Sequence, residues 1–183
     1  MPQGSLFVIS GPSGAGKGTL VKRILERVPN TWVSISATTR EPRAGEVDGI
    51  DYQFMTADEF ERDIEAGGFV EWASVHSHYY GTPVAPIEEQ LAAGKTVLLE
   101  IDVQGGFQVQ DKLPQAKLVF IAPPNMEVLE QRLRSRGTDS EEAIVQRMHN
   151  AVGEMEASAR YDAVIVNDDL DRATEELVKM IQS

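Results

Sequence analysis

The stretch Gly11-Pro12-Ser13-Gly14-Ala15-Gly16-Lys17-Gly18-Thr19 decides the fold of this chain. The apolar run Leu6–Ile9 before it predicts a buried strand, and the amphipathic run Leu20–Leu25 after it predicts a helix. A glycine loop between a strand and a helix turns several backbone N–H groups toward one hollow, where the helix N-terminus adds partial positive charge. We therefore predict a phosphate-binding loop in which Lys17 reaches the outer phosphates of a nucleoside triphosphate.

The loop departs from the usual signature at its last position. Gly18 stands where a serine or threonine commonly ligates magnesium. Thr19 lies about 100° further round the helix, so we expect that it does not take over this role. A glycine-rich turn without a ligand is the structural alternative, but three glycines and a lysine in register after a strand favour phosphate binding.

Composition limits the classes of protein to be considered. The chain has 183 residues, of which 42% are hydrophobic, and this suits one compact domain with inserted subdomains. A net charge of −12 argues against a surface for bulk nucleic acid, and the absence of cysteine leaves no thiolate zinc site. We find no signal peptide or membrane-spanning run and expect a soluble, cytoplasmic protein without a membrane partner. Nothing in the sequence specifies an oligomeric state.

Strand-like and helix-like segments alternate along the chain. Short apolar or alternating runs predict strands at 32–35, 52–54, 69–73, 96–102, 117–121 and 163–166. Helical patterns cover 57–64, 86–93, a short segment after Gly105-Gly106, 126–136, 140–158 and 170–181, while 36–49 has the composition of a loop. This order predicts an α/β fold with a parallel β-sheet core flanked by helices. Residues 36–82 and 125–150 look like excursions from that core, the first mixed and the second helical.

Two polar clusters are candidate sites outside the glycine loop. Arg40 and Arg43 flank Pro42, so both guanidinium groups could converge on one anion, although a solvated loop with scattered charges would have the same pattern. Glu100 and Asp102 lie two apart at a predicted strand end and so face the same way. Acids in this position hold magnesium or its waters, and solvent-facing acids are the alternative.

Three arginines lie on the predicted helices outside the core. Arg132 and Arg136 share a helix face, and Arg147 lies on the next helix. They fit a lid that closes over phosphates, while a charged helix surface would give the same spacing.

Taken together, these residues resemble the guanylate kinase family from Leu6 to about Ile181. The most specific motifs are Ser34-Ile35-Ser36-Ala37-Thr38-Thr39-Arg40-Glu41-Pro42-Arg43-Ala44-Gly45-Glu46, followed by Gly49 and Tyr52, and Tyr79-Tyr80-Gly81-Thr82. Segments 100–105, 132–137 and 167–169 add to the likeness. The resemblance implies transfer of the γ-phosphoryl group of ATP to GMP with Mg²⁺, giving ADP and GDP. It also implies a core (about 1–33, 83–124 and 151–183), a GMP-binding region (about 34–82) and a lid (about 125–150).

The resemblance further implies a role for each candidate residue. On the ATP side it places Gly11, Pro12, Ser13, Gly14, Ala15, Gly16, Lys17, Gly18 and Thr19, with Arg132 and Asn167 near the adenine. On the GMP side it places Ser36, Arg40, Arg43, Tyr52 and Tyr80 around the phosphate, and Glu71, Thr82 and Asp102 around the guanine. Lys17, Arg40, Arg136 and Arg147 would be the catalytic residues. Glu100, also on the GMP side, and Asp102 would meet magnesium through water, and no residue would ligate it directly.

Several departures keep other interpretations open. Glu100 replaces the family's usual aspartate, and His76-Ser77-His78 stands where a glycine and an asparagine are common. Gly-Lys-Gly-Thr also resembles adenylate kinases, so an adenylate kinase or another NTPase is one alternative. A non-catalytic guanylate-kinase-like binding module is another, although such modules tend to lose the phosphate loop. For Glu71, the alternative is a solvent-facing residue of an amphipathic strand.

Overall fold

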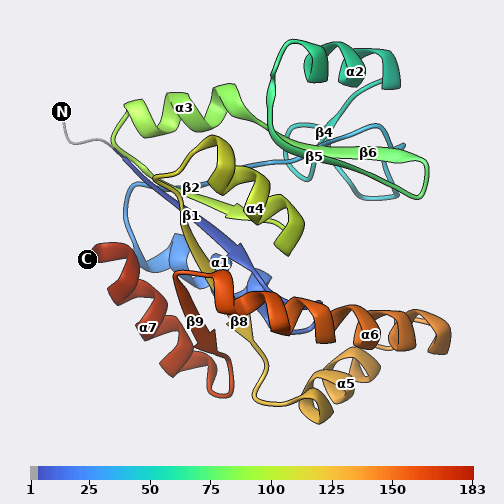
Figure 1. Ribbon diagram of the computed structural model, residues 1–183, viewed down its shortest axis with the longest axis vertical. Helices are drawn as coiled ribbons and strands as arrows, with labels where there is room; N and C mark the ends of the chain where they lie inside the picture. The colour runs from blue at the N-terminus through green and yellow to red at the C-terminus, as the bar shows by residue number, and fades with distance from the viewer. Residues whose placement is uncertain (1–3) are drawn as a thin grey trace.

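A computed structural model describes residues 4–183 and shows a five-stranded parallel sheet at the centre of the molecule (Figure 1). Its strands are β1 (Ser5–Ser10), β2 (Thr31–Val33), β7 (Thr96–Glu100), β8 (Lys117–Ala122) and β9 (Ala163–Val166). Their order is β2-β7-β1-β8-β9, and every neighbouring pair is parallel. The predicted fold class is therefore confirmed, and the glycine loop leaves the carboxyl end of the central strand.

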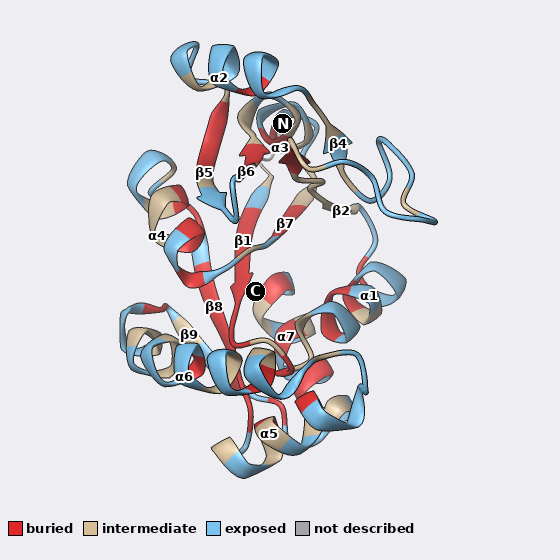
Figure 2. Ribbon diagram, turned by 90° about the vertical axis from the view of Figure 1, so that its right-hand side faces the viewer, coloured by how far each residue is buried: buried red, intermediate tan, exposed pale blue. Residues whose placement is uncertain are grey.

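Helices cover both faces of this sheet. Leu6 and Val8 face the cluster that contains helices α3 (Val84–Ala92) and α4 (Val103–Lys112). Phe7 and Ile9 face the opposite cluster, with α1 (Lys17–Arg27) and α7 (Leu170–Gln182). This alternation follows from the two-residue period of a strand. β1 and β8 are accordingly among the most buried segments (Figure 2). Each fully buried side chain of this kind stabilises the fold by about 1.5–3 kcal/mol.

A second, smaller sheet lies beyond α3 and α4 (Figure 1). It contains β3 (Ala37–Thr38), β4 (Gln53–Phe54), β5 (Phe69–Val75) and β6 (His78–Pro83), in the order β4-β3-β6-β5. Helix α2 (Ala57–Glu65) covers it, and the Phe60 ring stacks on Phe69 at a centroid distance of 4.2 Å. A Thr56–Glu59 capping box fixes the start of α2. This part of the chain therefore has a small core of its own.

The helices α5 (Met126–Ser135) and α6 (Glu141–Ala157) form a hairpin at the end of the molecule opposite the second sheet (Figure 1). Asn125 and Ser140 cap their N-termini through side-chain oxygens. Leu129 and Leu133 pack with α6 in a separate cluster. The helix α6 runs unbroken past residue 150 to Ala157, and the 3₁₀ turn Ser158–Arg160 follows. Between residues 4 and 183, no helix combines the length and the apolar character needed to cross a bilayer.

The structure corrects four details of the sequence analysis. Segment 36–49 is not all loop, because Ala37–Thr38 forms the buried strand β3 between β4 and β6. The strand β6 was not predicted, since Gly81 and Pro83 interrupt its alternation. The strand β7 ends at Glu100, and Asp102 leaves it to cap α4, so the two acids do not share a strand face. The helix α4 begins at Val103, before the two glycines, because that cap starts it.

Candidate active site

The glycine loop connects β1 to α1 through residues in left-handed conformation. Gly16, the N-cap of α1, has φ of 94°. A Cβ at this position would lie 2.4 Å from the amide nitrogen of Asn167, which donates a hydrogen bond to the Ala15 carbonyl (2.8 Å). Both the backbone conformation and this close approach therefore require glycine. The loop is held by the core on one side and keeps its N–H groups at the start of α1.

The Lys17 side chain folds back over the loop. Its ammonium donates to the carbonyl oxygens of Gly11 (2.6 Å) and Pro12 (3.2 Å). Burial lowers the pKa of Lys17, and the carboxylates of Glu100 and Glu154 oppose that shift. A buried ammonium that is held by neutral backbone carbonyls can exchange these contacts for stronger ones with an anionic ligand.

Arg132 and Asn167, both predicted on the ATP side, are direct neighbours. The Arg132 guanidinium donates to the Asn167 carbonyl oxygen (2.8 Å). Together they line a hollow beside the glycine loop, with Gly14, Gly16, Thr19, Asp168 and Leu170. The hollow therefore adjoins the glycine loop at Gly14 and Gly16.

The segment 40–46, which we call the arginine loop, is held together by Glu46, an acid to which the sequence analysis gave no role. The Glu46 carboxylate accepts from the Arg40 guanidinium (2.9 Å) and from the backbone N–H of Arg43 (2.8 Å). The hydrogen bond to Glu46 raises the pKa of Arg40. Arg40 also lies 5.3 Å from the centroid of the Tyr52 ring, within cation–π range. Arg43 is exposed, and the pKa of Glu46 is lowered by its hydrogen bonds from Arg40 and Arg43 and by the charges of both.

Aromatic and hydroxyl groups surround this loop. The Tyr52 and Tyr80 rings make an edge contact at a centroid distance of 6.2 Å. Ser36, Tyr52 and Glu100 line one hollow, which opens between the end of β2 and the segment 50–52. Ser36, Arg40, Tyr52 and Tyr80 therefore come together through β3, β4 and β6, although they are far apart in sequence.

Glu71 is a buried carboxylate rather than a solvent-facing residue of β5. Its exposed fraction is 8%, and the buried Thr82 hydroxyl donates to its Oε1 at 2.6 Å. That bond occupies the Thr82 proton, so Thr82 cannot at the same time donate to a base. Burial raises the pKa of Glu71, and the Thr82 hydrogen bond opposes that shift. A carboxylate in such an environment favours hydrogen-bond donors as partners.

The first turn of α4 lies against the Glu71 carboxylate. The Asp102 carboxylate accepts from the backbone N–H of Gly105 (2.7 Å), and a Cβ on Gly105 would lie 2.8 Å from the second oxygen of Glu71. Glu71 and Asp102, which lie 31 positions apart in the printed sequence, thus flank one glycine.

Two acids near the glycine loop, Glu100 and Asp102, are the candidates for contact with a magnesium ion. A Cβ on Gly18 would lie 3.6 Å from Oε1 of Glu100, so that carboxylate faces the start of α1. One oxygen of Asp102 is already used by the helix cap. Across residues 4–183, no group of three or more His, Cys, Asp or Glu side chains is arranged to hold a metal ion. The donors fit a magnesium ion that is held by phosphates and water, with Glu100 nearby.

The helical hairpin places its arginines differently. Arg147 on α6 donates to the hydroxyl of Ser13 in the glycine loop and lies 3.3 Å from the Asp139 carboxylate. Arg136 is exposed at the end of α5, and its positive charge contributes to the lowered pKa of Lys17. Arg134 instead forms ion pairs with Glu130 and Glu141 within the hairpin.

Sequence reasoning missed Glu46 and Glu154. The signal for Glu46 was available, because it follows Arg43 by three residues in the arginine loop. Glu154 has no local signal: it lies on α6 beyond the predicted lid, and only the fold places its carboxyl group near Lys17 and Asp102. Burial raises the pKa of Glu154, and Lys17 opposes that shift.

The parallel sheet and the glycine loop at the end of β1 define a P-loop α/β protein. The sequence model of the family described as Guanylate kinase matches residues 3–183. Guanylate kinases from Synechocystis sp. and Fusobacterium nucleatum are 55% and 51% identical; the matches cover 98% and 100% of this chain and 94% and 98% of theirs. The crystal structure of guanylate kinase from Anaplasma phagocytophilum superposes with a TM-score of 0.77 at 31% identity, over 99% of this chain and 86% of that one. The chain belongs to the guanylate kinase family.

Proposed function

We propose that the chain is an ATP:GMP phosphotransferase that moves the γ-phosphoryl group of ATP to GMP, giving ADP and GDP in purine nucleotide metabolism. The observation that carries this proposal is the buried Glu71 carboxylate beside the first turn of α4. The first turn of α4 follows β7 at the carboxyl edge of the core sheet, where the glycine loop also lies. Ligands of such folds bind at this edge.

On the ATP side, the backbone of Gly11–Thr19 binds the phosphates. Lys17 leaves the loop carbonyls to neutralise charge on the transferring group. Arg132 and Asn167 line the adenine pocket, which adjoins Gly14 and Gly16.

On the GMP side, Arg40 and Arg43 bind the acceptor phosphate with the hydroxyls of Ser36, Tyr52 and Tyr80. Glu46 supports this role, because it holds the Arg40 guanidinium and the Arg43 backbone before the ligand arrives. The arginine loop thus needs little reordering to form charge-assisted bonds.

Glu71 recognises the guanine. The base presents two donors side by side, N1–H and the 2-amino group, and a carboxylate offers two acceptors with matching spacing. Thr82 fixes one oxygen of Glu71, and Asp102 adds a second carboxylate at the same glycine. Adenine would present an acceptor at N1 and leave the buried carboxylate unpaired, and such sites reject the wrong partner by about 10⁴-fold.

The chemistry needs no protein nucleophile, because the acceptor phosphate oxygen attacks directly. The protein aligns two phosphates and neutralises their charge. Arg136 and Arg147 supply that charge from the lid, residues 125–150, while residues 34–82 bring GMP. The contact of Arg147 with Ser13 supports this role, because it brings the lid next to the loop that binds the phosphates. The limits of the lid and of the GMP-binding region are part of this proposal.

Magnesium, bound by the ATP phosphates and water, would neutralise phosphate charge, with Glu100 and Asp102 accepting from its waters. The partners in this proposal are the free nucleotides ATP and GMP, without nucleic acid or membrane. We place the reaction in the cytoplasm, where these nucleotides occur.

A coupled assay of ATP with GMP, AMP, CMP and UMP in turn tests the proposal. We expect ADP formation that depends on GMP. ADP formation without any monophosphate would indicate a plain NTPase, and preference for AMP an adenylate kinase. Nucleotide binding without turnover would indicate a binding module.

A further inference from the structure

The strand that carries Glu71 lies at an open edge of the second sheet. In the order β4-β3-β6-β5, which covers residues 4–183, β5 has a neighbouring strand on one side only. Edge strands present backbone N–H and C=O groups that need other partners when they are covered. Trp72 follows Glu71 directly, so the way its backbone groups are satisfied affects the position of the carboxylate.

The Gln108 side chain on α4 satisfies this edge in place of a strand. Its Oε1 accepts from the Trp72 N–H (3.1 Å), and its Nε2 donates to the Trp72 carbonyl oxygen (3.2 Å). One carboxamide thus makes the pair of bonds that a neighbouring strand residue would make.

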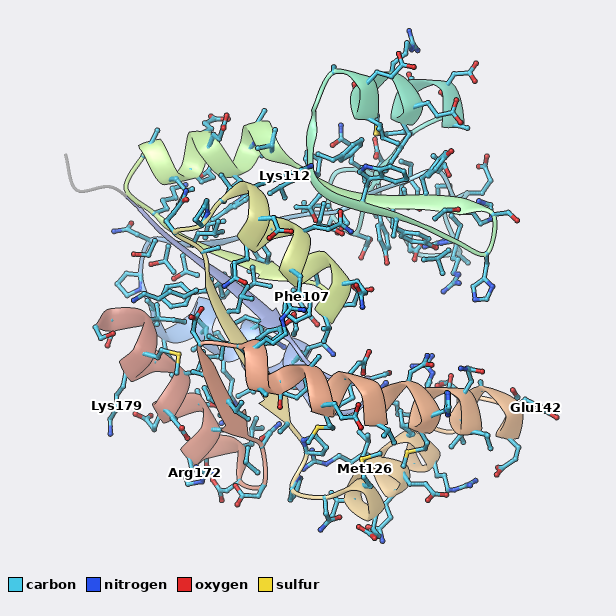
Figure 3. The ribbon with its side chains drawn as sticks, viewed as in Figure 1. Phe107, Lys112, Met126, Glu142, Arg172 and Lys179 are labelled. Carbon is cyan, nitrogen blue, oxygen red and sulfur yellow. The ribbon has the colours of Figure 1, made fainter. Side chains whose placement is uncertain are left out.

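One turn further along, Lys112 makes a second attachment. Its ammonium donates to the Phe69 carbonyl oxygen (2.8 Å), where α4 approaches the start of β5 (Figure 3). The two attachments lie on either side of Glu71 in sequence. The backbone of Glu71 is therefore fixed at positions 69 and 72, from the same helix.

Gly105 lies on the same face of α4, because it precedes Gln108 by three residues. Its missing side chain lets the helix approach until a Cβ would lie 2.8 Å from the Glu71 carboxylate and 3.2 Å from that of Asp102. Residues 105, 108 and 112 thus form one docking face, which we call the α4 face.

We propose that the α4 face sets the position of the Glu71 carboxylate, and that Gln108 is a positioning residue on which discrimination between GMP and AMP depends. The inference rests on the proposed function, in which Glu71 recognises guanine. Gln108 acts through the backbone of Trp72. A two-bond contact to N1–H and the 2-amino group needs both carboxylate oxygens in place, so a small shift of β5 weakens it.

The test is steady-state kinetics of Gln108→Ala with GMP, AMP and ATP varied in turn. We expect kcat/KM for GMP to fall by about 10–100-fold, with KM for ATP unchanged. The control is Gln110→Ala on the same helix, about 200° away from position 108. Gln110 is half-buried, and among residues 4–183 its side chain makes no hydrogen bond, so this variant should behave as wild type. Equal losses for GMP and ATP in Gln108→Ala would overturn the inference.

A double-mutant cycle with Glu71→Ala separates this inference from the proposed function. If Gln108 acts through Glu71, Gln108→Ala causes no further loss of GMP use when Glu71 is already alanine. Additive losses would show that Gln108 acts elsewhere. If Glu71→Ala itself leaves GMP use intact, the proposed role of Glu71 fails. If Glu71→Ala severely lowers GMP use and Gln108→Ala does not affect it, only the inference about Gln108 fails.

Two further variants keep the test decisive if Gln108→Ala does not fold. Gln108→Glu retains the acceptor for the Trp72 N–H and loses the donor to its carbonyl, so we expect an intermediate loss. Gly105→Ala leaves Gln108 intact and pushes directly on the Glu71 carboxylate. It should lower kcat/KM for GMP without changing KM for ATP, and GMP use as good as wild type in both variants would refute the inference.

Discussion

The glycine loop and the proposed guanine pocket around Glu71 lie near the carboxyl end of the core sheet, but they are built in opposite ways. The loop is one contiguous stretch, Gly11–Thr19, whose binding groups are mostly backbone N–H groups. The pocket combines Glu71 from β5, Thr82 from β6 and the first turn of α4. A phosphate site can be local in sequence, because phosphate needs only hydrogen-bond donors that converge on it. A base needs donors and acceptors in a fixed pattern, which several elements must supply.

The key side chains of the two sites have charges of opposite sign, and burial disfavours the charged form of each. Burial lowers the pKa of the Lys17 ammonium and raises that of the Glu71 carboxylate, since a dry environment disfavours both charged forms. Phosphate restores a partner to the first, and the guanine donors restore partners to the second. Each site is therefore selective for a ligand that completes it.

The largest expected effect is at Lys17, and it tests whether the two sites are separable. We predict that Lys17→Met lowers kcat by more than about 10²–10³-fold, because charge on the transferring group loses its neutralising partner. GMP affinity, measured by calorimetry, should persist, since its contacts lie in the other pocket. A variant with a tenth of wild-type turnover would contradict the role of Lys17.

Glu71→Ala tests the other side of the comparison. We expect kcat/KM for GMP to fall by about 10³–10⁴-fold and the gap between GMP and AMP to narrow, because the pocket loses both acceptors. ATP affinity should stay the same. Parallel kinetics with both monophosphates measure this, and GMP use at the wild-type level would assign the base to other residues.

The lid arginines are expected to affect both sites through closure. Arg136→Ala and Arg147→Ala should lower kcat by about 10–10²-fold, with little change in the affinity for either nucleotide, because their contacts form mainly in the transition state. The matched control is Arg134→Ala, whose guanidinium pairs with Glu130 and Glu141 on the hairpin. Weaker GMP binding with unchanged kcat would make Arg136 and Arg147 binding residues only.

The smallest effect concerns pH at Glu71. Its raised pKa places protonation above the ordinary value of 4.5, so acid removes the carboxylate that guanine requires and kcat/KM for GMP falls as pH is lowered. The Thr82 hydrogen bond holds that pKa down, and Thr82→Val should therefore move the acidic limb to higher pH.

The measurement is the difference between pH profiles of variants, because the GMP phosphate itself titrates at about pH 6. Thr174→Val is the control, since this buried threonine donates to the Leu170 carbonyl within α7, away from the site. An acidic limb that is identical in wild type and Thr82→Val would show that Glu71 does not govern it.

Much of the core was predictable because its signals are local. The runs around 96–102, 117–121 and 163–166 predicted strands close to those observed, and the helices at 126–136, 140–158 and 170–181 were placed within one or two residues. The second sheet was less predictable. Its two-residue strand β3 has no period of its own and exists because β4 and β6 lie on either side.

The sequence by itself determined the glycine loop, the order of strands and helices in the core and the family, because each depends on residues that are neighbours along the chain. Tertiary structure decided how Asp102 is used, by ending β7 early and making it the cap of α4. It also decided that Glu71 is buried, that Glu46 organises Arg40, and that Gln108 covers the edge beside Trp72. The physical reason is that burial and hydrogen-bond partners arise between segments distant in sequence, and only packing brings those segments together.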